Sequence, residues 1–194
     1  MQREVFFTQK VFKSLLRAMS FPGTVQSLEF SEELYQFLGD EFWALGSIAL
    51  TLIDGHTSFC VIGPNSKVLE ERIIKLTRSK VLPMKEADFV ITTEALQERL
   101  WDVKVGELRN PEKSATVFYL VEGVQEGIGG GVVLRLSGPG VKGERLISLF
   151  GLPPQEFLTL SQVNHLFPLG IDCFFVDKKG MLVGIPRSVK VEVL

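Results

Sequence analysis

The sequence predicts an α/β fold, a single domain built from a mixed β-sheet flanked by helices. In the first half of the chain, short apolar segments typical of strands alternate with segments of helical periodicity. The second half is richer in strand-like segments and contains one helical segment. No repeat, linker or low-complexity stretch divides the 194 residues, so we expect residues 1–194 to form one domain.

The N-terminal region predicts a helix, a tight turn and a strand. Residues 11–19 have helical periodicity, and Pro22-Gly23 suits the central positions of a type II turn. A strand is expected over residues 25–30. The apolar face of the helix is expected to comprise Val11, Phe12, Leu15, Leu16 and Met19.

The next elements are predicted from capping and hydrophobicity. Ser31 is a suitable N-cap for a helix that breaks near Gly39-Asp40 and ends near Ile53. Residues 42–53 are apolar almost all round, which predicts burial on more than one side. Further strands are expected over residues 57–62, 87–92, 115–122, 132–136, 171–177, 181–185 and 189–193, and further helices over residues 67–77, 94–101 and 155–166.

Composition favours a protein that binds other protein chains. Hydrophobic residues make up 45% of the chain, so either the core is large or a partner covers apolar surface, and we favour the partner. The net charge is −2 and the basic residues are dispersed, which argues against nucleic-acid binding. The longest apolar run is too short for a membrane span of roughly 20 residues, and no signal peptide is evident. We therefore expect a cytoplasmic protein.

Metal and thiol chemistry are not expected. Cys60 and Cys173 each lie in an apolar strand-like segment, which is typical of buried free thiols. His56 and His165 are far apart, and no Cys or His pair has the spacing of zinc ligands.

Residues 134–145 (LRLSGPGVKGER) contain the G-x-G-x-x-G pattern of a dinucleotide-binding turn. That function requires a long helix after the third glycine, but Gly151 and Pro153-Pro154 stop any helix within about two turns. Pro139 also removes a backbone donor that a phosphate would need. We therefore interpret the segment as a tight turn after a strand.

Two other polar segments have a functional and a structural interpretation. Residues 63–67 (GPNSK) could bind an anion at a helix N-terminus, but Asn65 or Ser66 capping that helix is the simpler interpretation. Asp54-Gly55-His56 brings a carboxylate near an imidazole without a nucleophile, so a turn is favoured there.

Four segments in this order resemble the family of the H subunit of bacterial carbon–phosphorus lyase, the PhnH family. They are FKSLLRAMSFPG (12–23), LRLSGPGVKGER (134–145), FPLGIDCFFVDKKGMLVGIPRS (167–188) and VKVEV (189–193), with a weaker similarity in SIALTLIDGHTSF (47–59). Together they span essentially the whole chain.

The resemblance implies a reduced pyridoxal-phosphate (PLP)-dependent transferase-like fold that has lost its cofactor. It also implies a homodimer in isolation, and in cells a complex with subunits G, I and J. That complex assists formation of a ribose 1-phosphonate 5-triphosphate from ATP and a phosphonate. We expect no cofactor, PLP included, and a structural or assisting role for the isolated chain.

The resemblance also singles out polar positions as candidates for ligand binding or for an interface, with catalytic residues unassigned. An arginine can bind a phosphate or a carboxylate of a ligand, but it can equally form a structural ion pair, such as Arg187 with Asp172 or with Glu192. The candidates are Arg17, Ser20, Arg135, Arg145, Asp172, Arg187 and Glu192.

Two alternative functions stay open. One is a stand-alone transferase that binds PLP, and the other is a homodimeric module that binds a phosphonate or a nucleotide without chemistry. The role as a subunit of the complex is compatible with ATP or phosphonate bound at a site shared with the sister subunits.

Overall fold

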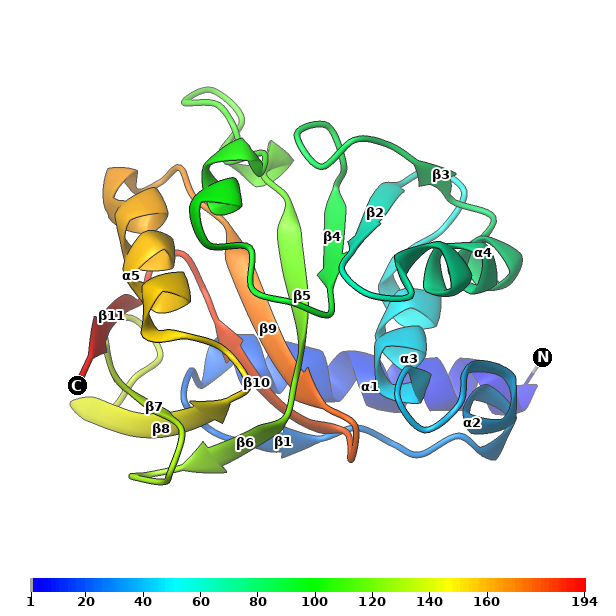
Figure 1. The fold of residues 1–194 in the computed structure, drawn as a ribbon, viewed down its shortest axis with the longest axis horizontal. Coiled ribbons are helices and arrows are strands. Elements are labelled where there is room, and N and C mark those ends of the chain that lie inside the picture. Colours follow the sequence, from blue (N-terminus) through cyan, green and yellow to red (C-terminus); the bar gives the residue numbers. More distant parts are fainter. Residues whose placement is uncertain (1) are drawn as a thin grey trace.

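The computed structural model describes residues 2–194, in which two β-sheets pack with helices on both sides of the larger sheet (Figure 1). The α-helices are α1 (Gln2–Ser20), α2 (Glu32–Leu38), α3 (Trp43–Leu52), α4 (Ser66–Thr77) and α5 (Pro154–Val163). Three 3₁₀ segments are η1 (Gln97–Asp102), η2 (Pro111–Lys113) and η3 (Asn164–Leu166).

The larger sheet is mixed, as the sequence predicts. Its seven strands are β1 (Gln26–Ser27), β2 (Ser58–Ile62), β3 (Lys80–Val81), β4 (Phe89–Thr92), β5 (Thr116–Val121), β9 (Asp172–Asp177) and β10 (Met181–Ile185). They lie in the order β1-β10-β9-β5-β4-β2-β3. Strands β3, β2, β4, β5 and β9 are parallel to one another, whereas β10 is antiparallel to β9 and β1 is antiparallel to β10. The alternation of strands and helices in the first half of the chain therefore builds β2, β3 and β4, and β5 and β9 from the second half complete the parallel part of the sheet.

A second, antiparallel sheet corrects the expectation of a single mixed sheet. Its strands are β6 (Gly123–Glu126), β7 (Val132–Ser137), β8 (Glu144–Phe150) and β11 (Lys190–Val193), in the order β11-β7-β8-β6. Neither β6 nor β8 is among the strands expected from the sequence. Residues 144–150 are expected only to be too short for a helix, whereas residues 144–149 pair with β7 and residues 147–150 pair with β6.

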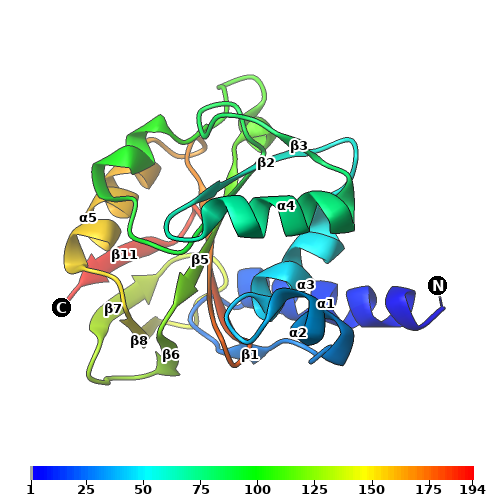
Figure 2. The same ribbon diagram turned by 45° about the vertical axis from the view of Figure 1, so that its right-hand side comes forward.

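Two hydrophobic clusters cover the two faces of the larger sheet, because successive side chains of a strand point to opposite sides. In β9, Cys173 and Phe175 belong to the cluster formed with α5, η1 and the second sheet. Phe174 and Val176, which alternate with them, belong to the cluster formed with α1, α2, α3 and α4. Figure 2 shows these two groups of elements on opposite sides of β5.

Helix α1 differs from its prediction in length and in the direction of its side chains. It begins at Gln2 rather than near residue 11. Its inner face consists of Val11, Leu15 and Ala18, which are at most 3% exposed. Phe12 and Leu16, expected on the same face, are 48% and 55% exposed. The helix therefore has two apolar faces, and only one is covered by the rest of the chain.

Close packing of α1 on the sheet depends on a glycine in β10. A Cβ added at Gly184 would lie 2.9 Å from the backbone carbon of Ala18 and 3.0 Å from its oxygen. Any side chain at this position would push the helix away from the strand, so the glycine permits the close approach of α1 to β10.

Several local predictions are confirmed. Gly23 has φ +81° and the Thr24 amide donates to the Phe21 carbonyl, as in a type II turn. The Ser31 hydroxyl accepts from the Leu34 amide as the N-cap of α2. The break near Gly39 separates α2 from α3, and most of α3 is buried.

Two other local predictions are wrong. The strand expected over residues 25–30 is only the two-residue β1. The helix expected over residues 94–101 is the 3₁₀ segment η1, which begins with Gln97 at φ +50°. Nowhere in residues 2–194 is there a helix with the length and apolar character needed to cross a membrane.

Candidate functional site

Three of the four segments that carry the family resemblance, 12–23, 134–145 and 167–188, meet in one cleft. Its volume is about 500 Å³, and it lies where the end of α1, the β7–β8 loop, the first residue of β9 and residues 186–188 come together. We refer to it as the motif cleft. It is lined by Met19, Ser20, Thr116, Pro139, Gly140, Asp172, Phe174, Pro186 and Ser188.

The glycine-rich segment of the sequence forms one wall of the motif cleft. It is the loop of the β7–β8 hairpin, with Gly138, Gly140 and Gly143 at positive φ, and a strand rather than a helix follows it. A Cβ added at Gly140 would lie 2.6 Å from the Ser20 carbonyl oxygen. The glycines therefore let the hairpin approach the end of α1, and the interpretation of this segment as a turn is confirmed.

Asp172, which lines the cleft, is paired with Arg187, which lies in the chain between the lining residues Pro186 and Ser188. The Arg187 Nη2 lies 2.5 Å from Asp172 Oδ2, and the Arg187 backbone amide donates to Asp172 Oδ1 at 2.8 Å. The same guanidinium donates to the Pro111 carbonyl at 2.8 Å and to the Ser114 hydroxyl. The side chains of Arg187 and Asp172 are only 15% and 27% exposed. All three guanidinium nitrogens are thus used inside the protein, which is the geometry of a structural ion pair.

Hydroxyl groups provide the free polar atoms of the cleft. The side chains of Ser20, Thr116 and Ser188 line it, and none of their hydroxyls forms a hydrogen bond with another described residue. Thr116 and Asp172 lie side by side in neighbouring parallel strands. The cleft thus presents hydroxyls and one carboxylate, and this carboxylate is already paired with Arg187.

The other candidate residues lie outside the lining of the motif cleft. Arg145, at the start of β8, is half-buried beside Gly23, and its guanidinium has no hydrogen bond or ion pair with the side chains that the structure describes. Arg135 pairs with Glu192 at 3.2 Å and with Glu144 at 3.5 Å across the second sheet. The side-chain hydrogen bond from Lys190 lowers the pKa of Glu192. Arg17 is exposed on α1.

The two alternative polar segments have structural geometries. The Asp54 carboxylate accepts from the His56 amide at 2.9 Å, which confirms a turn. Asn65 occupies the N-cap position of α4 at φ +60°, but its side chain makes no capping hydrogen bond. The structural interpretation of residues 63–67 therefore holds for the position of Asn65 and fails for its expected hydrogen bond.

The cysteines are buried free thiols, as predicted. Burial raises the pKa of Cys60 to about 12 and raises the pKa of Cys173 well above its usual value. Within residues 2–194 no three Cys, His, Asp or Glu side chains are grouped as metal ligands.

Sequence reasoning missed a buried carboxylate outside the motif cleft. Glu156, in the first turn of α5, is 1% exposed. Its two oxygens accept hydrogen bonds from the Tyr119 hydroxyl at 2.5 Å and from the Gln97 amide at 2.6 Å. Burial raises the pKa of Tyr119 well above its usual value. The group ties α5 to β5 and η1. A single Glu in the first turn of a helix gives no signal of this role, because such residues are common and mostly exposed.

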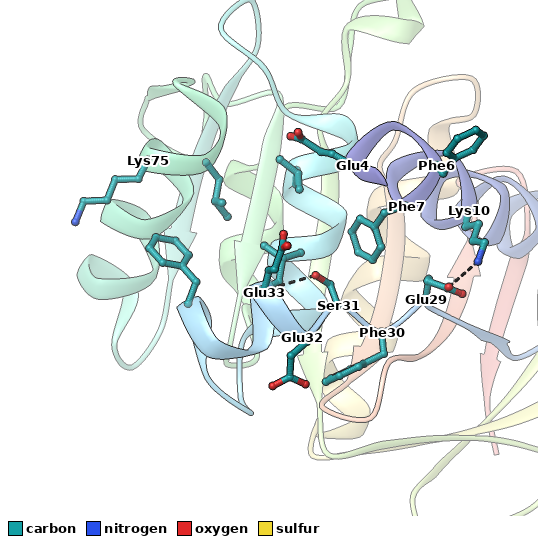
Figure 3. A pocket seen from close by; sticks show the side chains of 14 residues that line it. Glu4, Phe6, Phe7, Lys10, Glu29, Phe30, Ser31, Glu32, Glu33 and Lys75 are labelled. Atoms are coloured by element: carbon teal, nitrogen blue, oxygen red, sulfur yellow. Dashed lines mark hydrogen bonds and ion pairs between the residues drawn. The ribbon is translucent and has the colours of Figure 1, made fainter. Parts of the chain in front are cut away.

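A larger groove lies beside the N-terminal part of α1 (Figure 3). Its volume is about 1090 Å³, and it is bounded by α1, residues 29–37, α3 and α4. In Figure 3, Phe7 points into the space between α1 and residues 29–33. The charged groups around it are Glu4, Lys10, Glu29, Glu32, Glu33 and Lys75. Because carboxylates outnumber amines there, we call it the acidic groove.

Comparisons with known proteins agree with the resemblance. Residues 1–192 match the family described as bacterial phosphonate metabolism protein (PhnH). The chain is 31% identical over 192 residues to the alpha-D-ribose 1-methylphosphonate 5-triphosphate synthase subunit PhnH of Rhizobium meliloti (strain 1021), covering 97% of this chain and 92% of that protein. It is also 30% identical over 185 residues to HtxG of Stutzerimonas stutzeri, whose description assigns it provisionally as a C–P lyase subunit, covering 94% and 85%. A match of this extent over nearly every described element shows that the chain belongs to the PhnH family of bacterial phosphonate metabolism proteins.

Proposed function

We propose that this protein is a subunit of a carbon–phosphorus lyase core complex and acts in the catabolism of organic phosphonates. In this role it assists formation of ribose 1-phosphonate 5-triphosphate from ATP and phosphonate, with subunits G, I and J as its partners. The observation that carries the proposal is family membership over residues 1–192. The meeting of three of the resembling segments in the motif cleft indicates where the chain acts.

The chain is proposed to act by positioning rather than by chemistry of its own. In the motif cleft the carboxylate of Asp172 is held by Arg187, and none of the hydroxyls forms a hydrogen bond with it or with another base of the described chain. A nucleophilic hydroxyl needs such a base within hydrogen-bond reach. The free hydroxyls suit hydrogen bonds to a ligand or to a sister subunit.

Co-expression with subunits G, I and J of the same organism tests the proposal. Tagged wild-type chain is expected to co-purify with all three, and the complex to release adenine from ATP and methylphosphonate. Failure to co-purify under native conditions would contradict the proposal.

Arg145 is the most informative of the candidate arginines because its guanidinium is unpaired among the described side chains. Arg145→Gln is expected to keep the fold and to lose either assembly or adenine release. Arg135→Gln is the matched control on the same hairpin, since Arg135 already pairs with Glu192 and Glu144. Normal assembly with lost adenine release assigns Arg145 to a shared ligand site, and lost assembly assigns it to an interface. Wild-type behaviour in both assays would remove it from either role.

A homodimeric module that binds phosphonate or nucleotide is the second candidate, because the hydroxyls of Ser20, Thr116 and Ser188 are free. Calorimetry with ATP and with methylphosphonate on the isolated protein distinguishes it from a scaffold. Binding that is lost in Ser188→Leu, and kept in Ser161→Leu on α5, would support the binding module.

We also propose that the fold is a reduced PLP-dependent transferase fold that works without the cofactor. The seven-stranded mixed sheet with helices on both faces supports this relationship. Every lysine in the described chain is exposed except Lys104, whose amine pairs with Asp88 at 2.6 Å. A lysine that binds PLP needs an unpaired amine inside a pocket. Incubation with PLP followed by borohydride is expected to leave no specifically labelled lysine, and stoichiometric labelling of one lysine would overturn this.

A further inference from the structure

The motif cleft offers a ligand hydrogen bonds but no free cation. Its one charged lining residue is Asp172, and Arg187 holds both oxygens of that carboxylate, with Nε 3.2 Å from each of them. The other polar side chains in the lining are Ser20, Thr116 and Ser188, whose hydroxyls are free among the described residues. A hydroxyl both donates and accepts a hydrogen bond, so these three suit a ligand that carries hydroxyl or amino groups.

The surroundings of the cleft disfavour an anion. Ser20 is the last residue of α1, so the helix presents its C-terminal end to the cleft, and this end carries a partial negative charge. None of the nine lining residues is a lysine, an arginine or a histidine. Proteins bind phosphate groups with such cations or with a helix N-terminus. A phosphate or phosphonate that entered this cleft would lose its water without gaining a counter-charge.

The other lining side chains form apolar walls, which are Met19, Pro139, Phe174 and Pro186. The ring of Phe174 is 5% exposed and stacks on Phe118 with the centroids 5.3 Å apart, which holds it in place. Sites for small molecules have volumes of about 300–1,000 Å³ and are mostly apolar, with a few polar groups that orient the ligand. The motif cleft, at about 500 Å³, has this composition. A nucleoside carries both complements, because its ribose has hydroxyls and its base is a flat ring.

We propose that the motif cleft binds the uncharged nucleoside part of a nucleotide. The free hydroxyls of the cleft bind the hydroxyls of the ribose, the apolar walls pack against the base, and the phosphates stay outside the cleft. A phosphonate is not a ligand of this cleft. The inference rests on the proposed function for the choice of nucleotide, because ATP is the substrate named there. It deepens that function by assigning one part of the substrate to this chain.

Calorimetry on the full chain tests the class of ligand. Adenosine is expected to bind at one site per chain. ATP is expected to bind with a Kd within about threefold of that of adenosine, because the cleft gives its phosphates no cation. Methylphosphonate and inorganic triphosphate are expected not to displace adenosine. The analogue 2′,3′-dideoxyadenosine, which lacks the ribose hydroxyls at those positions, is expected to bind about 3- to 30-fold more weakly than adenosine, because it loses neutral hydrogen bonds.

Removal of the cleft hydroxyls tests which groups bind the ribose. The variant Thr116→Val with Ser188→Ala loses two hydroxyls of the cleft with little change in side-chain shape. In this variant the ratio of the Kd of the dideoxy analogue to the Kd of adenosine is expected to fall toward one. Ser161→Ala, on α5 and outside the cleft, is the matched control and is expected to keep the wild-type ratio. Circular dichroism verifies that each variant folds, and Ser188→Ala alone gives a smaller change of the same sign.

Four results would overturn the proposal. Displacement of adenosine by methylphosphonate or triphosphate would make the cleft an anion site. Equal affinity for adenosine and its dideoxy analogue would show that the ribose hydroxyls are not bound, and equal affinity for adenosine and free ribose would show that the base is not bound. Absence of adenosine binding would also overturn it, and loss of the sister subunits from the hydroxyl variant would then assign the cleft to an interface.

The proposed function is tested separately by co-purification with subunits G, I and J. A chain that co-purifies with them but binds no adenosine loses this inference and keeps the proposed function. A chain that binds adenosine as expected but never associates with the sister subunits keeps the nucleoside site and loses the role in the complex.

Discussion

At the scale of single residues, buried polar groups are the most consequential feature outside the apolar core. Asp172 and Arg187 satisfy each other below the motif cleft, and Glu156 is satisfied by one hydroxyl and one backbone amide. No buried side-chain nitrogen or oxygen within the described residues lacks a hydrogen-bond partner. A buried polar group without a partner lowers the free energy of unfolding. Removal of one partner is therefore expected to lower it by more than the hydrogen bond contributes on balance.

Tyr119→Phe tests the buried network. The substitution removes the hydroxyl that donates to Glu156 and leaves one carboxylate oxygen buried without that donor. We expect a loss of about 1–3 kcal/mol in the free energy of unfolding, measured by urea titration. Tyr35→Phe is the matched control, because Tyr35 is 36% exposed on α2 and should change stability little. An equal change in the free energy of unfolding for the two substitutions would show that the hydrogen bond from Tyr119 to Glu156 does not stabilise the fold.

Asp88 predicts a dependence of stability on pH. Burial alone would raise the pKa of Asp88, but hydrogen bonds from Lys104 and Ser58 outweigh it and lower that pKa below its usual value. A carboxyl whose pKa is lower in the folded state stabilises the fold above its unfolded pKa, and this stabilisation is lost as the pH falls through the folded pKa. The difference in Tm between wild type and Asp88→Asn is therefore expected at neutral pH and should shrink below about pH 4. Asp40→Asn, at an exposed position, is the control. A difference in Tm between wild type and Asp88→Asn that grows as the pH falls would contradict a lowered pKa of Asp88.

At the scale of elements, the β7–β8 hairpin shows how turn chemistry positions a site. Its loop glycines adopt positive φ, and Gly140 is also in close contact with the end of α1. The end of α1 and the hairpin loop are therefore located relative to each other by a backbone contact, and the cleft lies beside it.

Gly140→Ala and Gly143→Ala separate backbone strain from close packing. Both glycines have positive φ, but an added Cβ at Gly143 has no atom within 4 Å, whereas at Gly140 it would approach Ser20 and Pro22. Gly143→Ala is expected to cost only the strain, about 1–2 kcal/mol. Gly140→Ala is expected to cost about 1–3 kcal/mol more, because the hairpin must move away from α1. Thermal unfolding measures both, and equal losses would mean that the contact with α1 contributes nothing.

The elements also show which parts of the fold are predictable. Ser31, Pro22-Gly23 and Gly39 are interpreted correctly because capping and turn preferences act within a few residues. Strand β8 is missed because residues 144–150 have no clear alternation of polar and apolar side chains, and only its pairing with β7 fixes its conformation. Segment η1 depends similarly on Glu156, which lies 59 residues from Gln97.

At the scale of the whole molecule, the larger sheet separates two hydrophobic clusters that share its strands. Because alternate residues of β5 and β9 belong to different clusters, neither cluster can lose its packing without disturbing the same strands. We therefore propose that residues 1–194 unfold as a single domain.

Probes in the two clusters test this proposal. In Trp101→Phe the remaining tryptophan, Trp43, reports on one cluster, and the reactivity of Cys173 toward a thiol reagent at pH 8 reports on the other. Burial raises the pKa of both cysteines, so no thiol is expected to react in the native state. Fluorescence and thiol reactivity are expected to change at the same urea concentration. Two separate midpoints would show that the clusters unfold independently.

The α/β class can be predicted from the sequence alone, together with most strands and helices, the burial of both cysteines and the family. These depend on local periodicity, turn chemistry and ordered motifs, all of which can be read along the chain. The folded chain adds that there are two sheets, that Arg187 pairs with Asp172, and that α1 keeps an uncovered apolar face beside an acidic groove. These features escape prediction because strand pairing, ion pairing and the covering of a helix face join segments far apart in sequence. Local preferences do not select among the many distant partners available.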